Sequence, residues 1–443
     1  MKRFFDTLRN INKIEELRKR ILYTLGIIVI YRIGTFIPLP GVNPEFLGAL
    51  QQQTSDGILG LLNMFSGGAF SNASILALGI MPYITSSIVM QLLGMMIPYF
   101  QKMQREGESG RRKMNQITRL LTVVVTAFQA PAFLTNLVNM VPIEGIPLLA
   151  ASPAFFWISS TAILTSGTLF VMWLGERITD KGIGNGISMI IMIGIIARLP
   201  FALFAEFVSR IEELGGGLVI FAVEIVFLIV VILLCILLVQ GTRRIPVQYA
   251  KRIVGNKQYG GVRQYLPMKV NAAGVMPIIF AQAIMFVPII IAGFVAPDGS
   301  GVGGALMNFE GFWYNFMFAI IIIMFTYFYT AVTINSQQIS DDLKKNGGFI
   351  PGVKPGRQTA EFIDTVISRI TLPGSIFLAC VAIMPAIVTK FGVNSQFAQF
   401  YGGTSLLIMV GVVLDTLQQI ESHLLMRHYD GLTKSGRIKG RMG

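Results

Sequence analysis

The side chains that could perform catalysis are few in this sequence, and they form none of the common catalytic patterns. A zinc protease would place two histidines and a glutamate in an HExxH sequence, and a nucleotide site would require a Walker A sequence; the chain contains neither. Its two histidines, His423 and His428, stand near its end without such a pattern. The glycines of GIGNG at 182–186 resemble a phosphate loop, but they follow an apolar segment and not a strand, which favours a turn. We therefore expect neither enzymatic activity nor a metal or cofactor site.

The cysteines and the acids within apolar segments also favour structural roles. Cys235 and Cys380 both lie in apolar runs, which is typical of inert packing residues and not of a disulfide or metal pair. Glu224 and Asp415 fall inside apolar segments, where a charge is costly and usually functional. An ion-coupled transporter would normally show several such groups, whereas these two stand alone in the sequence. We interpret both as structural.

The composition indicates a polytopic membrane protein. Only 13% of the 443 residues are charged, against roughly 25% in soluble domains, and the mean hydropathy is +0.64. We predict ten spanning helices, each near the ~20 residues that a bilayer requires. The first follows a basic run and lacks a small-residue cleavage site, so we expect it to be retained. The predicted spans are 21–37, 75–98, 117–138, 155–174, 183–204, 218–239, 273–295, 312–334, 370–389 and 404–425.

The basic residues predict the orientation of these spans. Lys and Arg gather before the first span and in the loops after the second, sixth and eighth, while the alternate loops hold only Arg198, Arg210 and Lys390. The positive-inside rule therefore places both termini in the cytoplasm. The formal net charge of +13 is also compatible with a surface that docks RNA or anionic lipid.

The ten spans divide into two sets of five near residues 206–217. We predict an N-terminal half, 1–205, and a C-terminal half, 206–443. Because five is odd, the second set starts on the outer face, so related halves would form inverted repeats with the working site between them near the midplane. The expected fold is an all-α polytopic membrane protein with ten transmembrane helices in two inverted five-helix halves around a central pore.

The stretch 63–98 departs from the regular pattern of spans. Residues 63–74 are too short and too polar to cross a bilayer, yet too apolar for a solvated loop, while 75–98 is long enough to span. This combination suggests a half-inserted, re-entrant helix. Such backbone is tolerated at membrane depth only inside protein or beside a water-filled cavity, so the stretch predicts a cavity with a segment in it.

Isoleucines and uncharged polar residues recur at helical spacing in several spans. Ile80 and Ile84 share one helix face, as do Ile187 and Ile191; on pattern alone these are packing or lipid-facing residues. The uncharged polar residues within the spans would form hydrogen bonds between helices, each contributing about 0.6 kcal/mol. Interfaces held by such weak bonds also suit helices that separate and reclose.

Two long cytoplasmic loops, 240–269 and 335–371, are rich in basic residues and turn formers. The first holds RRIPVQYAKR, whose Val and Tyr residues next to charges are compatible with a hairpin, and the second holds several Pro and Gly residues, which form turns. Either loop alone is best explained as a solvated linker. Two such loops on one face predict a docking platform.

Six sequence blocks stand out in order along the chain: NMFSGGAFSNASILALGIMPYI at 63–84, EGESGRRK at 106–113, MWLGERITDKGIGNGIS at 172–188, IPVQYAKR at 245–252, PGVKPGRQTAEFID at 351–364 and YGGTSLLI at 401–408. Together they resemble the SecY/Sec61-alpha family of protein-translocase channel subunits. The likeness covers nearly the whole chain, including the span count and both long loops. It implies an hourglass channel in the bacterial cytoplasmic (inner) membrane that passes unfolded secretory polypeptides and releases apolar segments sideways into lipid.

The resemblance also assigns roles to individual residues. The half-helix after the first outer loop, about 63–74, would be the plug, with Asn63, Met64, Phe65, Ser66, Gly67, Gly68, Ala69, Phe70, Ser71 and Asn72. The pore ring would be Ile80, Ile84, Ile187, Ile191, Ile279 and Ile408. An apolar constriction of this kind dewets and blocks ions, yet makes no hydrogen bonds that would hold a sliding chain. The lateral gate, between spans 2–3 and 7–8, would hold Thr85, Gln129 and Asn271.

The partners that the resemblance implies would dock on the basic loops. The docking residues would be Arg243, Arg244, Lys251, Arg252, Lys257, Lys354 and Arg357. Lys354 stands where the family usually has Arg, so it keeps the charge but lacks the planar fork. The implied partners are the SecE and SecG subunits, the SecA motor ATPase, the ribosome through RNA contacts, signal peptides and nascent chains, and anionic lipids. The motor or the ribosome would supply the energy, since the chain has no nucleotide motif.

Two other classes of membrane protein would require different residues. An inverted-repeat solute transporter would need charged or unwound polar groups at the midplane, where this sequence offers isoleucines. An intramembrane protease would need a catalytic dyad or triad on facing spans, and the sequence shows none.

Overall fold

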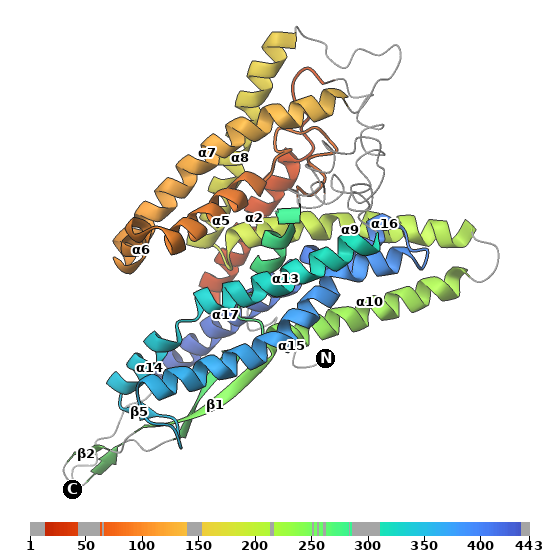
Figure 1. Cartoon of the computed structure of the whole chain (residues 1–443). Coiled ribbons are helices and arrows are strands. Elements are labelled where there is room, and N and C mark those ends of the chain that lie inside the picture. Colours follow the sequence, from red (N-terminus) through yellow and green to blue (C-terminus); the bar gives the residue numbers. More distant parts are fainter. Residues whose placement is uncertain are drawn as a thin grey trace. The chain divides into compact units, whose positions relative to one another are not determined.

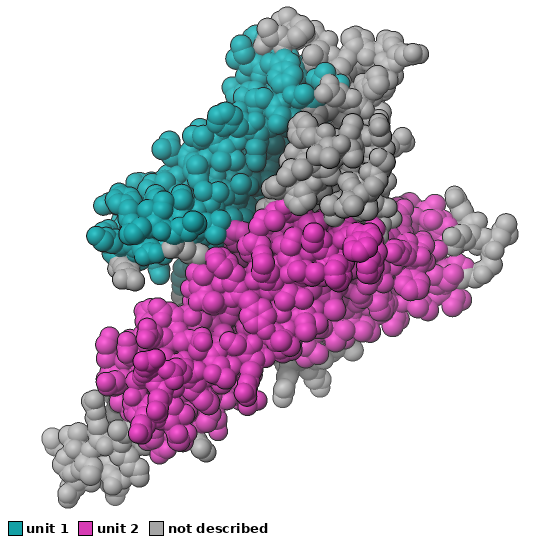
Figure 2. All heavy atoms as spheres, in the orientation of Figure 1, with its two compact units in different colours: residues 1–202, 412–443 teal, residues 203–411 magenta. Residues whose placement is uncertain are grey.

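The computed structural model describes residues 14–42, 63, 66–139, 153–212, 217–249, 252–254, 257–259, 263–282, 284–285 and 311–435. These residues are mostly helical (Figure 1). The chain divides into two compact units, residues 1–202 with 412–443, and residues 203–411 (Figure 2). Two helices, α9 and α17, contribute to both units.

The first unit is a set of long helices. It contains α2 (Glu15–Gly34), α5 (Met81–Met96), α6 (Pro98–Arg105), α7 (Glu108–Asn139), α8 (Pro153–Lys181), the first part of α9 (Gly186–Glu212) and the later part of α17 (Gly403–Ser435). Helix α7 packs against α5 and α8, and α2 packs against α8. Ile97 is extended between α5 and α6 (φ −104°, ψ 122°) because Pro98 follows it. The two helices are bent by 102° at this break.

The second unit combines helices with a small sheet. Its helices are α10 (Gly217–Gln240), α13 (Phe312–Thr333), α14 (Ser336–Lys345), α15 (Arg357–Thr389), the short α16 (Ser395–Ala398) and the 3₁₀ turn η1 (Gln399–Tyr401). Residues 276–282 are also helical. The strands are β1 (Thr242–Tyr249), β2 (Arg252–Val254), β3 (Lys257–Tyr259), β4 (Arg263–Lys269) and β5 (Gly348–Phe349).

The sheet confirms the hairpin expected in the first long loop. Strands β1 and β4 are antiparallel with Thr242 opposite Lys269, and the strand order is β4-β1-β5. Ile245 and Val247 of β1 are buried in an apolar cluster with residues of α14 and α15, among them Ile363. The alternation in the sequence therefore gives a strand with one face packed on helices.

The helices agree with most of the predicted spans that the structure describes, except at the start of the second span. Seven helices among the described residues are long and apolar enough to cross a membrane, or eight if α5 and α6 form one bent span. Helix α2 covers most of the predicted span 21–37, and the predicted span 273–295 lies partly outside the described residues. The count of ten and the division at 205/206 stay predictions.

The structure differs from the sequence prediction at residues 66–80. These residues form consecutive turns in place of the expected re-entrant helix and the first part of the second span, and α5 begins only at Met81. Gly67, Gly68 and Gly79 have positive φ angles of 65°, 90° and 52°, which interrupt a right-handed helix. Pro82 then starts the helix, as proline does in a first turn.

Candidate functional site

The predicted plug, residues 63–74, is held by hydrogen bonds to the end of α2. The Arg32 guanidinium donates from Nη1 to the Gly67 carbonyl at 2.7 Å. The Tyr31 hydroxyl donates to the Ser66 carbonyl at 3.2 Å. Both acceptors are main-chain oxygens, so these contacts depend on the path of the backbone. Met64 and Phe65 lie outside the described residues.

The chain after α2 pairs with the end of the predicted plug. The Leu39 N–H donates to the Ala73 carbonyl at 2.9 Å, and the Ile75 N–H donates to the Ile37 carbonyl at 3.0 Å. These bonds form a short antiparallel bridge. They satisfy buried main-chain groups that no helix or sheet serves.

Polar side chains fix the turns within the predicted plug. The Ser71 N–H donates to Oδ1 of Asn63 at 3.0 Å, and the Phe70 N–H donates to Oγ of Ser66 at 3.1 Å. Asn63, Ser66 and Ser71 are all buried. Side chains of this type compete with helical hydrogen bonds by capping nearby N–H groups, which explains why the segment is a series of turns.

Helix α9 approaches the predicted plug at a pair of glycines. A Cβ atom on Gly67 would lie 2.8 Å from the Cα of Gly194, closer than two such atoms come in proteins. One turn further along α9, the Arg198 guanidinium donates from Nη2 to Oγ of Ser71 at 3.1 Å. Glycine at position 67 is therefore required both by its φ of 65° and by this contact.

The predicted ring residues of α9 share the face that approaches the plug. Ile187, Ile191, Gly194 and Arg198 follow one another at spacings of three or four residues, which lie along one side of a helix. Ile191 is buried and Ile187 is partly buried. The Cγ1 atom of Ile187 also packs toward α8, where a Cβ on Gly175 would lie 3.0 Å away.

The predicted ring residues of α5 stand at its first turn. Ile80 occupies the N-cap position directly before the helix and is 2% exposed, and Ile84 is partly buried. A Cβ on the preceding residue, Gly79, would lie 3.6 Å from the Cα of Ser66. The start of α5 is thus adjacent to the predicted plug.

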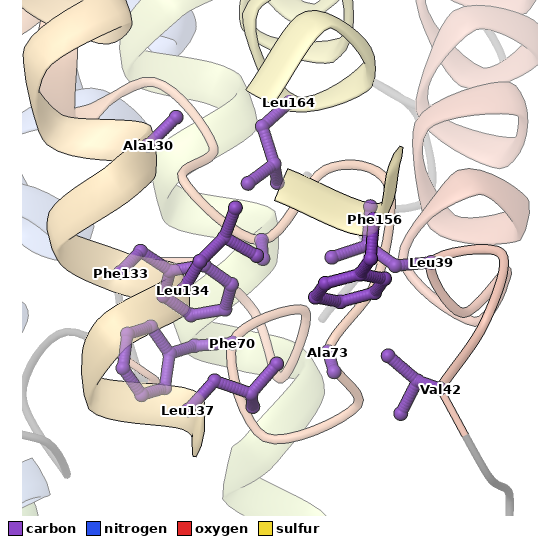
Figure 3. Close-up of a cluster of buried hydrophobic side chains, with 11 residues drawn as sticks. Leu39, Val42, Phe70, Ala73, Ala130, Phe133, Leu134, Leu137, Phe156 and Leu164 are labelled. Atoms are coloured by element: carbon purple, nitrogen blue, oxygen red, sulfur yellow. The ribbon is translucent and has the colours of Figure 1, made fainter. Parts of the chain in front are cut away.

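An apolar cluster anchors the other side of the predicted plug (Figure 3). The Phe70 ring packs edge-on against Phe133 of α7, with centroids 4.9 Å apart. Ala73 is fully buried in the same cluster. The remaining buried members are Leu39, Val42, Ala77, Ala130, Leu134, Leu137, Phe156 and Leu164.

Two predicted ring residues belong to the second unit. Ile279 is partly buried within the helical residues 276–282. Ile408, near the start of α17, is 8% exposed. Both lie on helical segments, as the family resemblance implies. The assignment of the six isoleucines to one ring stays a prediction.

The predicted gate residues have separate local environments. The Thr85 hydroxyl donates to the Met81 carbonyl of its own helix at 3.1 Å, and the side chain is exposed. Gln129 on α7 is partly buried. The Asn271 Oδ1 atom is buried and accepts no hydrogen bond from the residues that the structure describes. Their role as a gate stays a prediction.

The two long loops join into one substructure of the second unit. Strand β5, from the second loop, pairs with the end of β1, from the first, with Gln248 opposite Phe349. Arg243 and Arg244 are exposed at the start of β1. The sheet therefore connects the two loops that were expected to dock partners together.

The remaining predicted docking residues are exposed or only partly described. Lys354 is exposed, and its carbonyl accepts a hydrogen bond from Thr359 Oγ1 at 2.9 Å. Arg357 pairs with Glu361 at 3.0 Å, with both side chains largely in solvent. Arg252 and Lys257 lie on β2 and β3, whose side chains are outside the described set, as is the whole of Lys251.

A buried ionic cluster that sequence reasoning missed lies in the second unit. Arg210 pairs through Nε with Glu206 at 2.9 Å and through Nη2 with Glu224 at 2.7 Å. Its Nη2 also donates to the Gly392 carbonyl at 2.8 Å, and Glu206 accepts from the Asn394 N–H at 2.8 Å. The three charged side chains are 1% to 8% exposed.

This cluster revises the view of Glu224 as an isolated acid. Its carbonyl also accepts a hydrogen bond from the Tyr401 hydroxyl at 2.9 Å. Burial raises the pKa of the Tyr401 hydroxyl most, and the nearby Glu224 and Glu206 carboxyls raise it further. The i,i+4 spacing of Glu206 and Arg210 was a visible signal, but the link to Glu224 depends on how α9 and α10 pack. Asp415, the other acid, is exposed.

Metal binding finds no support among the residues that the structure describes, where no three His, Cys, Asp or Glu side chains gather. Among the described residues, the predicted plug and its supports pair no acid with a base that could act on a substrate.

The SecY family model matches residues 74–417. The chain belongs to the SecY family. The SecY protein translocase subunit of Halalkalibacterium halodurans is 44% identical over 440 residues, covering 97% of this chain and all of the relative. That of Mycobacterium tuberculosis is 41% identical over 448 residues, covering 97% and 99%.

Solved SecY-like structures share the fold. A solved protein-conducting channel matches with a TM-score of 0.62 at 17% identity, over 95% of each chain. Sec61 in the canine ribosome-channel complex matches with a TM-score of 0.58 at 16% identity, again over 95% of each chain. As a member of the SecY family, the chain is a multi-pass membrane protein and a channel subunit of a protein translocase.

Proposed function

We propose that this protein-conducting channel is sealed by the plug and by a ring formed by Ile80, Ile84, Ile187, Ile191, Ile279 and Ile408. The observation that carries the proposal is the contact of the plug with the α9 face that bears Ile187 and Ile191. A solved SecY relative is described as having a plug domain that stabilises the closed state and maintains the membrane seal. In this chain the described plug residues are buried, except for the partly buried Asn72, and the segment is anchored on three helices.

Opening would displace the plug and let an unfolded chain pass the isoleucines, which offer it no hydrogen bonds. Apolar segments would leave sideways into lipid through a gate lined by Thr85, Gln129 and Asn271. The buried Oδ1 of Asn271 supports this, because a polar atom without a partner among the described residues weakens helix packing where it lies. The halves that separate would be 1–205 and 206–443.

The platform formed by β1, β4 and β5 would receive the SecA motor or the ribosome, since a solved relative is bound to the ribosome. Its exposed cations, Arg243, Arg244, Lys354 and Arg357, suit phosphate-rich RNA or acidic protein. Arg252, Lys257 and Lys251 would extend this surface. Both termini would then lie in the cytoplasm of a bacterium, with the chain in the cytoplasmic (inner) membrane.

The complex would further include the SecE and SecG subunits, signal peptides and nascent chains as substrates, and anionic lipids at the basic surface. The chain itself would have no enzymatic activity, and energy would come from its partners. These assignments follow from membership of the family and from the absence of a nucleotide motif in the sequence.

Planar-bilayer conductance of six single Ile→Gly variants tests the ring. If the isoleucines line the pore, each change should wet the constriction and give ion conductance in the resting channel while the fold survives. If they only pack, each change should lower thermal stability, by roughly 2 kcal/mol or more at a buried site, without conductance. Electrically tight channels across the whole set would refute the ring.

A further inference from the structure

Two arginines reach the glycine pair of the plug within the first unit. Arg32 of α2 donates to the Gly67 carbonyl at 2.7 Å, and Arg198 of α9 donates to Ser71 Oγ at 3.1 Å. A Cβ atom on Gly67 would lie 2.9 Å from Nη1 of Arg32, and one on Gly68 would lie 3.5 Å from Nε of Arg198. Both guanidinium groups therefore reach successive residues of the same turn.

These two charges have neutral oxygens as their acceptors. The ion pairs found among the described residues do not include Arg32 or Arg198. Both side chains are partly buried, and buried charges are normally paired with an opposite charge. A hydrogen bond from a guanidinium to an anion is roughly twice as strong as one between neutral groups. The plug thus occupies donors that an anion would satisfy better.

We propose that Arg32 and Arg198 form an anion site that the plug covers in the closed channel and exposes when it leaves. The site takes chloride or the carboxylates of a passing polypeptide. The inference rests on the proposed movement of the plug. The open pore then favours anions, because fixed cations in a low-dielectric cleft raise the local concentration of anions.

Ion selectivity of a channel that lacks residues 65–72 tests this site. The reversal potential in a KCl gradient gives the chloride-to-potassium permeability ratio. We expect the ratio to fall about tenfold in the R32Q/R198Q variant, the lower end of the effect that charged clefts have on local ion concentration. Lys390→Gln is the control, because it removes an exposed charge at the end of α15 and should leave the ratio unchanged.

Added potassium glutamate distinguishes the two sources of the anion. Block of the chloride current by glutamate, lost in R32K/R198K because lysine lacks the planar fork, identifies carboxylates as occupants. Chloride selectivity that depends on the arginines, without glutamate block, identifies small inorganic anions. Both results support the site. An unchanged permeability ratio in R32Q/R198Q overturns it.

A channel that conducts nothing after the deletion would refute the proposed seal, and a second measurement then decides the anion site. Ala69 is fully buried, so Ala69→Cys, in a chain with Cys235→Ala and Cys380→Ser, reports plug release through maleimide labelling. Glutamate or chloride, each at a concentration equal to its dissociation constant, should accelerate labelling about twofold by mass action. Acceleration by either anion that requires Arg32 and Arg198 supports the site, and a rate that neither anion changes overturns it.

Discussion

Replacing Arg210 with leucine should destabilise the second unit strongly. The substitution leaves Glu206 and Glu224, whose side chains are 1% and 8% exposed, without their cation. It also removes the donor to the Gly392 carbonyl. Breaking a buried ion pair by removing one partner costs about 3–5 kcal/mol. At roughly 2 °C per kcal/mol, the lower end for large domains, the melting temperature should fall by roughly 6–10 °C.

The assay is thermal unfolding of the purified protein in detergent, with two comparisons. Arg119→Leu removes an ion pair of 2.7 Å to Glu176 whose side chains are 49% and 26% exposed, so it should cost only ~0–1 kcal/mol. The neutral combination of Glu206→Gln, Arg210→Met and Glu224→Gln should recover most of the loss, because it leaves no uncompensated charge.

Two results would contradict this reasoning. A melting temperature of Arg210→Leu equal to that of Arg119→Leu would show that the cluster contributes no more than a surface pair. A neutral triple variant as unstable as Arg210→Leu would show that the loss comes from packing or from the Gly392 contact, and not from buried charge.

The plug and the platform allow three further predictions. Gly67→Ala should release the plug and give ion leak in planar bilayers, because the φ of this residue is 65° and the added Cβ would clash with the backbone of α9. Gly352→Ala is the control, since Gly352 has a φ of 84° and open space around it. This variant should lose only the ~1–2 kcal/mol that the left-handed conformation costs, and its channel should not leak ions. Phe70→Ala should also leak, because a buried Phe contributes about 3–5 kcal/mol; a stable, tight variant would show that the ring contact does not hold the plug. Replacing Arg243 and Arg244 with Glu should weaken SecA or ribosome binding in sedimentation assays, and wild-type binding should weaken with salt; binding that neither change affects would leave these residues a role in orientation alone.

Features that depend on local pattern could be predicted from the sequence. The apolar helices follow from runs of suitable length, and the β1–β4 hairpin follows from the alternation around Ile245 and Val247. The family resemblance predicts the position of the plug, and the short length and the Gly-Gly pair of this segment are visible in the sequence itself. These local patterns predict structure because each segment gains free energy by burying its own apolar surface.

Features that depend on distant contacts could not be predicted. Local glycines and polar caps account for the turns of residues 66–80, but no local pattern reveals that these turns bond to α2 and closely approach Gly194. The Arg210 cluster joins residues from α9, α10 and the segment before α16, so Glu224 looked isolated in the sequence. The same is true of Arg198, which the charge pattern counted with the outer loops although it falls in the predicted span 183–204, and which donates from α9 to Ser71.

The anchors of the predicted plug differ in what they require of its sequence. Arg32 and Tyr31 bind main-chain carbonyls, so they require only that the backbone follow its present path. That path is set by the positive φ angles of Gly67 and Gly68. Phe70, by contrast, requires its own side chain to fill the cluster at Phe133. Substitutions at the glycines should therefore disturb every anchor together, because the bonds to α2 and the position of the Phe70 ring both depend on one backbone geometry.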